Sequence, residues 1–415
     1  MNIFLLGNGY DLHHNFPTRY IDFLNVVDFI IENEGTTFST VGEVFSNPQL
    51  QDKNKFIKDA YEKHSRIYDD VNLNQEEFKQ MLELAKKNIW FKYFNETRNK
   101  ELCWIDFEKE IAVVINAFEN FFEKTNGNSD GVFVKNNIFH FDISKYPEDA
   151  MVRFIIKKFN FFFEKDNSSD AMFATFSGGV LQKIHKSYCI EQYVGSKCFV
   201  LNFEKIVSEL YDSLRELSQI LKLYLKLFIE TPTKRYNEMG IKAKCRSWSK
   251  ADRVVTFNYT NTYENLYGNT SSIYHIHGEV KENIILGVNP DEKDELSNID
   301  TMFVCFKKYF QRVYHKTDLK YLREFHEIIE MNNFDCGNVL NVIGHSLDIT
   351  DKDIIAELFY SCRKINIWYH EKSVVASYIK NLVEIFGKKE FDKIRREKEL
   401  EFLPQAEIEW EYPKL

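Results

Sequence analysis

Two polar residues that each follow a short apolar run could do chemistry together. Asn258 comes directly after the β-branched run 253–257, and His277 directly after the run 272–276. Such runs are typical of buried strands. In a parallel sheet, polar residues just past the carboxyl ends of strands face the crevice where ligands bind. The sequence therefore predicts that Asn258 and His277 face one pocket.

The types of these two residues suit hydrolysis. An asparagine amide carries both a donor and an acceptor and can position a water, and an imidazole can accept that water's proton near neutral pH. Asn258 and His277 are accordingly the predicted catalytic residues. His275 would share a strand face with His277 and is a rival for its role. In the structural alternative, the histidine is a satisfied strand-end residue and the asparagine forms a turn.

A loop with two glycines lies close to the amino terminus. The apolar residues 3–6 form a predicted strand that runs directly into Gly7, Asn8 and Gly9. Glycines at this spacing let the backbone turn tightly and approach a ligand, with exposed amides suited to phosphate. The third glycine of the dinucleotide fingerprint is absent, so a plain turn is the alternative. Asp11 could hold ribose hydroxyls or cap a helix end.

Composition and charge exclude several classes of protein. Of the 415 residues, 44% are hydrophobic and the formal charge is −9, which argues for a globular chain without a large cationic surface for duplex DNA or anionic lipid. A local basic groove stays open, so nucleic acid is not excluded. The seven cysteines are scattered and form no C-x-x-C pair, so no disulfide framework, zinc site or other metal is expected. No signal peptide or long apolar run is present, which predicts a cytoplasmic protein that does not enter a membrane.

The remaining elements predict an α/β fold that is interrupted by an insertion. A helix is expected at 18–34, strands at 283–290, 339–343 and 364–369, and helices after the last two strands. Alternation of strand and helix favours a Rossmann-like doubly wound, mostly parallel sheet. We therefore expect residues 1–35 to begin this domain, 36–250 to form a mainly helical insertion, 251–390 to complete the domain, and 391–415 to be a docked or frayed tail.

Three predicted helices of the insertion span 76–94, 102–124 and 205–229. Leu210, Leu214, Leu217, Leu221 and Leu225 form one stripe on the last helix, and this stripe is expected to be core because sustained heptads are absent.

Two groups that contain charged residues have two interpretations each. Trp104, Asp106 and Glu108 lie near the start of a predicted helix, where the dipole favours carboxylates, but one carboxylate could instead be presented to the pocket. Farther along the chain, Lys307, Lys308, Gln311 and Arg312 form a small cationic patch. It is expected to be a solvated helix face or to meet phosphate.

Several short blocks together resemble a known family, the bacteriophage abortive infection AbiH family. The blocks appear in the family's order and span almost the whole chain. The resemblance implies a bacterial antiphage protein that halts or kills the infected cell. The matching blocks are Gly7-Asn8-Gly9-Tyr10-Asp11-Leu12, Trp104-x-Asp106-Phe107-Glu108, Thr256-Phe257-Asn258-Tyr259-Thr260, Ile276-His277-Gly278-Glu279 and Gly344-His345-Ser346-Leu347-x-x-x-Asp351.

A more distant resemblance concerns mechanism. The glycine loop, the asparagine, the His-Gly pair and the Gly-x-Ser-Leu loop are similar to the NAD site of sirtuin-like domains, including those of antiphage NAD hydrolases. This resemblance implies that Asn258 is an active-site asparagine, that His277 is the catalytic histidine, and that Gly344 and Ser346 flank the ribose and phosphates. Unlike sirtuins, the chain has no four-cysteine zinc module, so peptide deacetylation is not expected. The full set of expected nucleotide-binding residues is Gly7, Asn8, Gly9, Asp11, Gly278, Gly344, Ser346 and Asp348.

Three functions of different kinds follow. The first is an effector that hydrolyses NAD, as substrate, at the nicotinamide–ribose bond. The second is a metal-dependent nuclease, in which Asp11, Asp106, Glu108, His277 and Asp348 would gather a divalent ion. The third is a non-catalytic module that binds a nucleotide or a phage protein. The expected partners are a nucleotide ligand and an unidentified phage-derived trigger, and the aromatic helical block could build a homo-oligomer interface.

Overall fold

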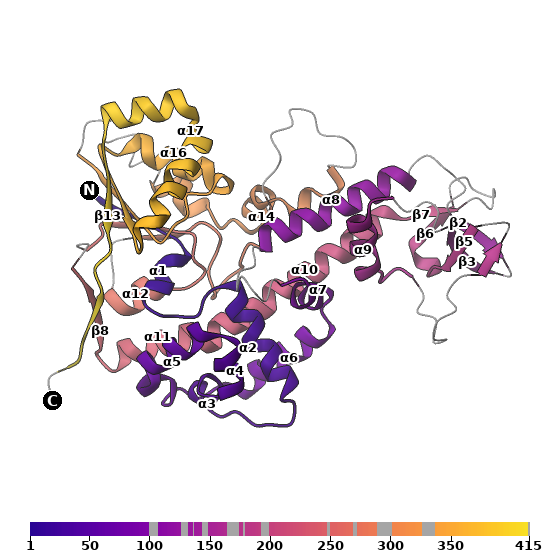
Figure 1. Ribbon diagram of the computed structural model, residues 1–415, viewed down its shortest axis with the longest axis horizontal. Coiled ribbons are helices and arrows are strands. Elements are labelled where there is room, and N and C mark those ends of the chain that lie inside the picture. The colour runs from indigo at the N-terminus through magenta and orange to yellow at the C-terminus, as the bar shows by residue number, and fades with distance from the viewer. Residues whose placement is uncertain are drawn as a thin grey trace.

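The computed structural model describes residues 1–98, 107–125, 132–135, 137–142, 148–163, 174–176, 179–191, 199–246, 250–268, 272–288, 301–325 and 337–413. A six-stranded parallel sheet lies in the upper left of the view in Figure 1. Its strands, in spatial order, are β10 (Ile273–His275), β9 (Arg253–Thr256), β1 (Asn2–Leu6), β11 (Val339–Ile343), β12 (Lys364–Tyr369) and β13 (Glu399–Pro404).

The strand order confirms the predicted fold class. Numbered along the chain, the six strands lie in the order 3-2-1-4-5-6, and every pairing is parallel. This is the order of doubly wound dinucleotide-binding folds. It reverses between β1 and β11, so the loops that follow these two strands diverge and leave a crevice at the carboxyl edge of the sheet.

Side chains of β1 alternate between two hydrophobic cores. Ile3 and Leu5 pack with α16 (Lys352–Ser361) and α17 (Val375–Glu397), the helices above the sheet in Figure 1. Phe4 and Leu6 face the opposite way, toward α12 (Thr262–Tyr267) and the helical part of the chain. Both faces of the sheet are therefore covered, which explains why β1 reads as an uninterrupted apolar run.

The insertion between β1 and β9 is largely helical, as expected. The predicted helix 76–94 is in fact two helices, because Asn88 ends the first and its side-chain oxygen accepts a hydrogen bond from the Phe91 N–H at 2.9 Å, which caps the second. The helices of this body are α2 (Tyr20–Glu32), α3 (Val41–Phe45), α4 (Pro48–Lys53), α5 (Lys55–Tyr68), α6 (Gln75–Lys87), α7 (Ile89–Thr97), α8 (Phe107–Thr125), α9 (Ala150–Lys158), α10 (Phe203–Leu225) and α11 (Thr231–Glu238).

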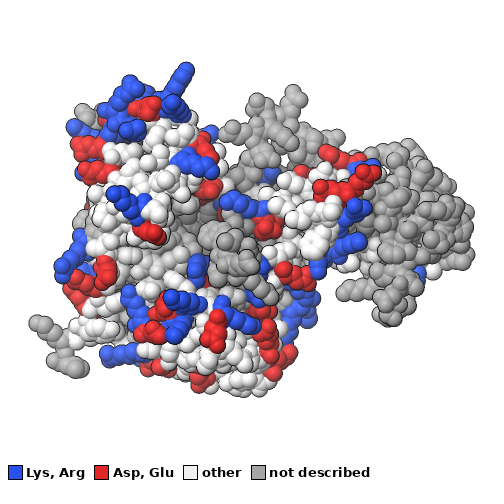
Figure 2. Space-filling model, in the orientation of Figure 1, with Lys and Arg blue, Asp and Glu red and all other residues white. Residues whose placement is uncertain are grey.

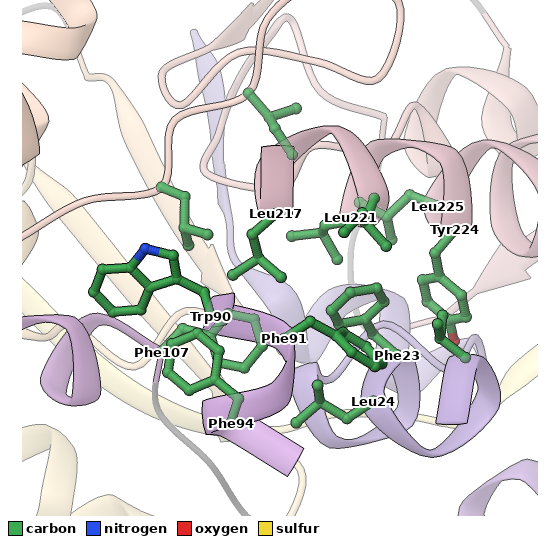
Figure 3. Close-up of a cluster of buried hydrophobic side chains, with 14 of the residues drawn as sticks. Phe23, Leu24, Trp90, Phe91, Phe94, Phe107, Leu217, Leu221, Tyr224 and Leu225 are labelled. Carbon is green, nitrogen blue, oxygen red and sulfur yellow. The ribbon is translucent and has the colours of Figure 1, made fainter. Parts of the chain in front are cut away.

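An aromatic core holds this body together. Figure 3 shows Phe23 of α2 and Phe91 of α7 packed against Leu217 and Leu221 of α10. Every leucine of the predicted stripe is buried, which confirms that it is core. Each fully buried side chain of this size contributes about 1.5–3 kcal/mol to the free energy of unfolding, so this layer fixes where α2, α8 and α10 stand relative to one another.

Residues of the insertion also form a small antiparallel sheet, which projects to the right in Figure 1 beyond the end of α8. The strands are, in spatial order, β4 (Ala174–Phe176), β5 (Gly179–Lys183), β3 (Ile138–Asp142), β2 (Val132–Lys135), β7 (Phe199–Leu201) and β6 (Cys189–Glu191).

Two strand assignments at the carboxyl side differ from expectation. The predicted strand 283–290 is wrong within its described residues: Ile284 and Val288 form isolated bridges, with Gly278 and Lys307, and no continuous ladder. Conversely, the segment expected to be a tail supplies β13, and then β14 (Ile408–Glu411), which pairs with β8 (Lys242–Cys245). These strands are amphipathic and charged on one side, because they lie at edges.

Acidic and basic side chains are interspersed over the described surface in Figure 2, in line with the modest net charge. Among the described residues, no helix has the length and apolar character needed to cross a bilayer.

Candidate functional site

A cavity of about 1060 Å³ opens at the carboxyl edge of the parallel sheet. Its volume slightly exceeds the range of roughly 300–1,000 Å³ that is usual for small-molecule sites. One side is formed by the loops after β1, β9 and β11, at the reversal of strand order. The opposite side is formed by the helical body, which contributes Tyr20, Ile21, Ala112, Leu221 and Leu225. The insertion therefore completes the site.

Nine of the ten predicted catalytic and nucleotide-binding residues line this cavity, and they come from four separate segments. They are Gly7, Asn8, Gly9, Asp11, Asn258, His277, Gly344, Ser346 and Asp348. The prediction that Asn258 and His277 face one pocket is confirmed in its geometry, and their catalytic role stays a prediction.

The loop that carries Asn258 is held on several sides. Its backbone N–H donates to Thr256 Oγ1 at 3.0 Å, and its carbonyl accepts from His275 Nδ1 at 3.0 Å. Glu230, at the end of the π-helical turn η3 (Lys226–Glu230), accepts a hydrogen bond from the backbone N–H of Asn261. The helical body thus holds the backbone of the loop in place at the cavity wall, which Asn258 lines.

His275 is not a second candidate for the cavity. Strand β10 ends at His275, so the alternation of faces stops there, and His277 turns into the cavity while His275 lines a separate small pocket. The expectation that the two histidines share a face is therefore wrong. With its Nδ1 bound to the Asn258 carbonyl, His275 is a structural residue of the neighbouring loop.

Gly7 and Gly9 allow the loop after β1 to pack closely against the loop after β11. A Cβ on Gly7 would lie 2.6 Å from the His345 Cα, and one on Gly9 would lie 2.8 Å from the Gly344 backbone. The amides of both glycines are used: Gly7 N–H donates to the Ile343 carbonyl at 3.2 Å and Gly9 N–H to the Gly344 carbonyl at 2.8 Å. The expectation that these amides are exposed for phosphate is therefore wrong for Gly7 and Gly9. They instead join the ends of β1 and β11.

Gly278 does not line the cavity. It has φ of 80°, and a Cβ there would lie 1.8 Å from the Asn283 carbonyl oxygen, so glycine is required by the turn after His277. Asn8 and Asp348 do line it, with their side-chain oxygens bound to Thr18 Oγ1 at 2.6 Å and to the Thr350 N–H at 3.1 Å.

The Asp351 carboxylate lies close to both His277 and His345, a connection that was not predicted from the sequence. Its Oδ1 lies 3.3 Å from His277 Nε2, and its Oδ2 lies 3.4 Å from His345 Nε2. His345 Nδ1 accepts a hydrogen bond from the Leu347 N–H at 2.9 Å, so its proton is on Nε2, toward the carboxylate. The His277 contact is not an aligned hydrogen bond, which is common for catalytic groups before substrate binds.

The charges around this centre decide which groups are ionised. Burial and the neighbouring Lys308 lower the pKa of His277 to about 4, although Asp351 opposes them, so the imidazole is neutral at pH 7. Burial alone would raise the pKa of Asp351, but Lys308 and the histidines hold it well below its usual range. The site therefore presents an imidazole with a free lone pair beside a carboxylate anion.

For Lys308, the interpretation as part of a solvated helix face is wrong. Its side chain is 3% exposed, and its Nζ lies 2.8 Å from Glu108 Oε1 and 3.4 Å from Asp351 Oδ1. Gln311 is also buried, and Arg312 pairs with Asp353 at 2.6 Å. The patch is thus not a solvated face, because three of its four residues point into the protein or into ion pairs.

Glu108 reaches Lys308 because the preceding residue is anchored. Phe107 is fully buried, and its ring stacks on Tyr20 and Phe94 with centroids 4.1 Å apart in each case. Glu108 follows in the first turn of α8, as the first interpretation expected, and it also lines the cavity, as the second expected. Trp104 and Asp106 lie outside the described residues.

The residues proposed to bind a divalent ion in the nuclease hypothesis do not form a metal site within the described part of the chain. No group of three or more His, Cys, Asp or Glu residues there could hold an ion. The ammonium of Lys308 already lies between Glu108 and Asp351.

Asp11 is buried at the edge of the cavity, 1% exposed. Its Oδ2 accepts a hydrogen bond from Thr260 Oγ1 at 2.5 Å, while its Oδ1 is buried without a hydrogen-bond partner among the described residues. Burial raises the pKa of this carboxyl to about 7, against the lowering effect of the Thr260 hydroxyl. Asp11 makes no capping bond to α1 (Asn8–His13), so the capping alternative is wrong.

Comparison with known proteins gives one match. A family described as bacteriophage abortive infection AbiH matches residues 3–370, which includes every loop that lines the cavity. No curated protein and no solved structure gives a significant match.

Proposed function

The chain belongs to the bacteriophage abortive infection AbiH family, and from that premise we propose that it is an effector that hydrolyses NAD at the nicotinamide–ribose bond. The observation that carries the proposal is the meeting of Asn258 and His277 in one dinucleotide-sized cavity at the reversal of strand order. In doubly wound sheets this is where nucleotides bind.

The reaction needs little acid catalysis. The C1′–N bond breaks with its electron pair moving to the pyridinium nitrogen, so nicotinamide leaves as a neutral base. Water adds to the oxocarbenium-like ribose carbon and loses one proton, which gives ADP-ribose. The protein must hold the ribose, exclude bulk water and place one water opposite the departing ring.

The described residues can meet these needs. The Asn258 amide can orient the water or a ribose hydroxyl, because its loop is fixed by Thr256, His275 and Glu230. His277 is neutral at pH 7 and can accept the proton, and Asp351 beside it stabilises the imidazolium that forms. The apolar wall from α2 and α10 can pack against a base.

The decisive experiment is incubation of purified protein with NAD and chromatographic measurement of nicotinamide and ADP-ribose, with and without phage extract. We expect release of both products in equal amounts. His277→Ala and Asn258→Ala are each expected to lower kcat by about 10²–10⁴-fold. Their thermal unfolding should stay close to that of the wild-type protein.

His275→Ala is the matched control, because it removes a neighbouring imidazole that does not line the cavity. Its effect should be smaller than that of His277→Ala. Stabilisation by NAD without any product would instead indicate the binding module, and metal-dependent cutting of nucleic acid would indicate the nuclease. Wild-type turnover in the His277→Ala protein would refute the assigned role.

A further inference from the structure

Among the carboxylates that line the cavity, Asp11 has an unusual environment. Most of the others are compensated: Glu108 and Asp351 share Lys308, and Asp353 pairs with Arg312. Asp348 is partly exposed to solvent and uses its Oδ1 to cap a turn.

Asp11 lacks such a partner. Within the described part of the chain it forms no ion pair with a lysine or arginine, and the charged group that most affects it is another buried acid, Glu230. Its polar neighbours are uncharged: Thr260 donates to it, Thr262 donates in turn to Thr260 at 3.2 Å, and the Asn258 side chain also favours its ionised form. Among the described residues, its other oxygen, Oδ1, is buried without a hydrogen bond, and Asp11 lines the cavity.

An isolated buried carboxyl of this kind is costly to ionise and gains most from a cation that enters the cavity. A divalent metal would need several more ligands, and no group of three or more His, Cys, Asp or Glu residues in the described part of the chain could hold one. A phosphate would be repelled. A flat organic cation with delocalised charge needs no ligand set and matches both the single charge and the apolar residues that line the cavity.

Resting on the proposed function, we infer that Asp11 is the counter-ion for the positively charged ring of the substrate, so that the site selects N-ribosylpyridinium nucleotides over otherwise identical nucleotides with an uncharged base. In this role the Asp11 carboxylate attracts the positive charge of the nicotinamide ring, which a residue that only binds ribose hydroxyls would not do. Oxidised NAD carries this charge on nicotinamide and reduced NADH does not, while their ribose, phosphate and adenine parts are the same.

The test compares binding of NAD and NADH by calorimetry at pH 8, in the His277→Ala background so that NAD is not consumed. We expect NAD to bind at least about tenfold more tightly than NADH. Adding Asp11→Asn, which keeps the shape and removes the charge, should weaken NAD binding to the level of NADH and change NADH binding by less than about twofold.

Thr260→Val in the same background is the matched control, since it removes the hydroxyl bonded to Asp11 and keeps the carboxyl. The preference for NAD should persist in this variant. If NAD binds but Asp11→Asn leaves the preference intact, the counter-ion role is wrong and the proposed function stands. If neither nucleotide binds and the wild-type protein releases no nicotinamide, the proposed function fails and this inference fails with it.

Discussion

Nζ of Lys308 lies 2.8 Å from Oε1 of Glu108, and this ion pair joins two helices beside the cavity that Glu108 lines. Lys308 begins α14 (Lys308–His315), while Glu108 begins α8 and the third member, Asp351, ends the turn η6 (Ile349–Asp351) after β11. One buried ammonium therefore connects three segments that are far apart in the chain.

Replacement of Lys308 by methionine should destabilise the fold strongly. It leaves Glu108 and Asp351 without their cation, and removing one partner of a buried ion pair costs about 3–5 kcal/mol. Chemical denaturation measures the change in the free energy of unfolding. Lys307→Met is the matched control, since Lys307 is less buried, and it should cost less than about 1 kcal/mol. Equal effects of the two variants would contradict the bridging role.

Asp351 should act on His277 rather than on substrate. In Asp351→Asn, the raising effect of the carboxylate on the His277 pKa is lost, so that pKa falls below its value of about 4. Because His277 works as the neutral base, activity is lost as the pH falls through this pKa. The acidic limb of the pH–rate profile should therefore move to lower pH, together with a fall in kcat of at least about tenfold.

Asp353→Asn provides the comparison for Asp351, since Asp353 lines the same cavity but pairs with Arg312. Its acidic limb should not move. An unshifted limb in Asp351→Asn as well would limit Asp351 to a structural role.

The close approach of the loops after β1 and β11 predicts that alanine is tolerated less well at Gly344 than at Gly337. The two glycines have nearly the same φ angle, 67° and 66°, which alanine rarely adopts. A Cβ on Gly344 would lie 2.0 Å from the Tyr10 backbone nitrogen, whereas nothing lies within 4 Å at Gly337. Gly344→Ala should therefore lower the free energy of unfolding by at least about 2 kcal/mol more than Gly337→Ala, as measured by chemical denaturation. Similar losses would show that the two loops do not approach this closely.

The buried carboxyl of Asp11 should make stability depend on pH. Its pKa rises from 3.8 to about 7 on folding, so the folded protein holds its proton more tightly than the unfolded chain. The associated stability is complete below pH 3.8 and is lost as the pH rises to about 7. Asparagine at this position does not ionise, so the Asp11→Asn variant does not lose this stability. As the pH rises, its free energy of unfolding should increasingly exceed that of the wild type, by up to ~4 kcal/mol near pH 8. Unfolding curves at pH 4 and pH 8 measure the difference, and parallel curves would contradict it.

The amino-acid sequence alone determined the main strands and the fold class. The apolar runs that became β1, β9, β11 and β12 are buried on both faces, so their signal is continuous and needs no partner to be read. It also located Asn258 and His277, because polar residues at the ends of such runs must lie at one edge of a parallel sheet.

The partners of the site residues were decided by contacts between segments that are far apart in the sequence. Lys308 looks like a surface cation in the sequence, since its partners Glu108 and Asp351 lie far away along the chain and no local pattern reveals them. The glycines at 7 and 9 looked like phosphate ligands, but their amides are taken by the loop after β11. β13 was missed because an edge strand is half solvated and charged. The local pattern of apolar residues predicts which face of a helix or strand is buried. It does not predict which distant segment packs against that face, because that contact forms only in the folded chain.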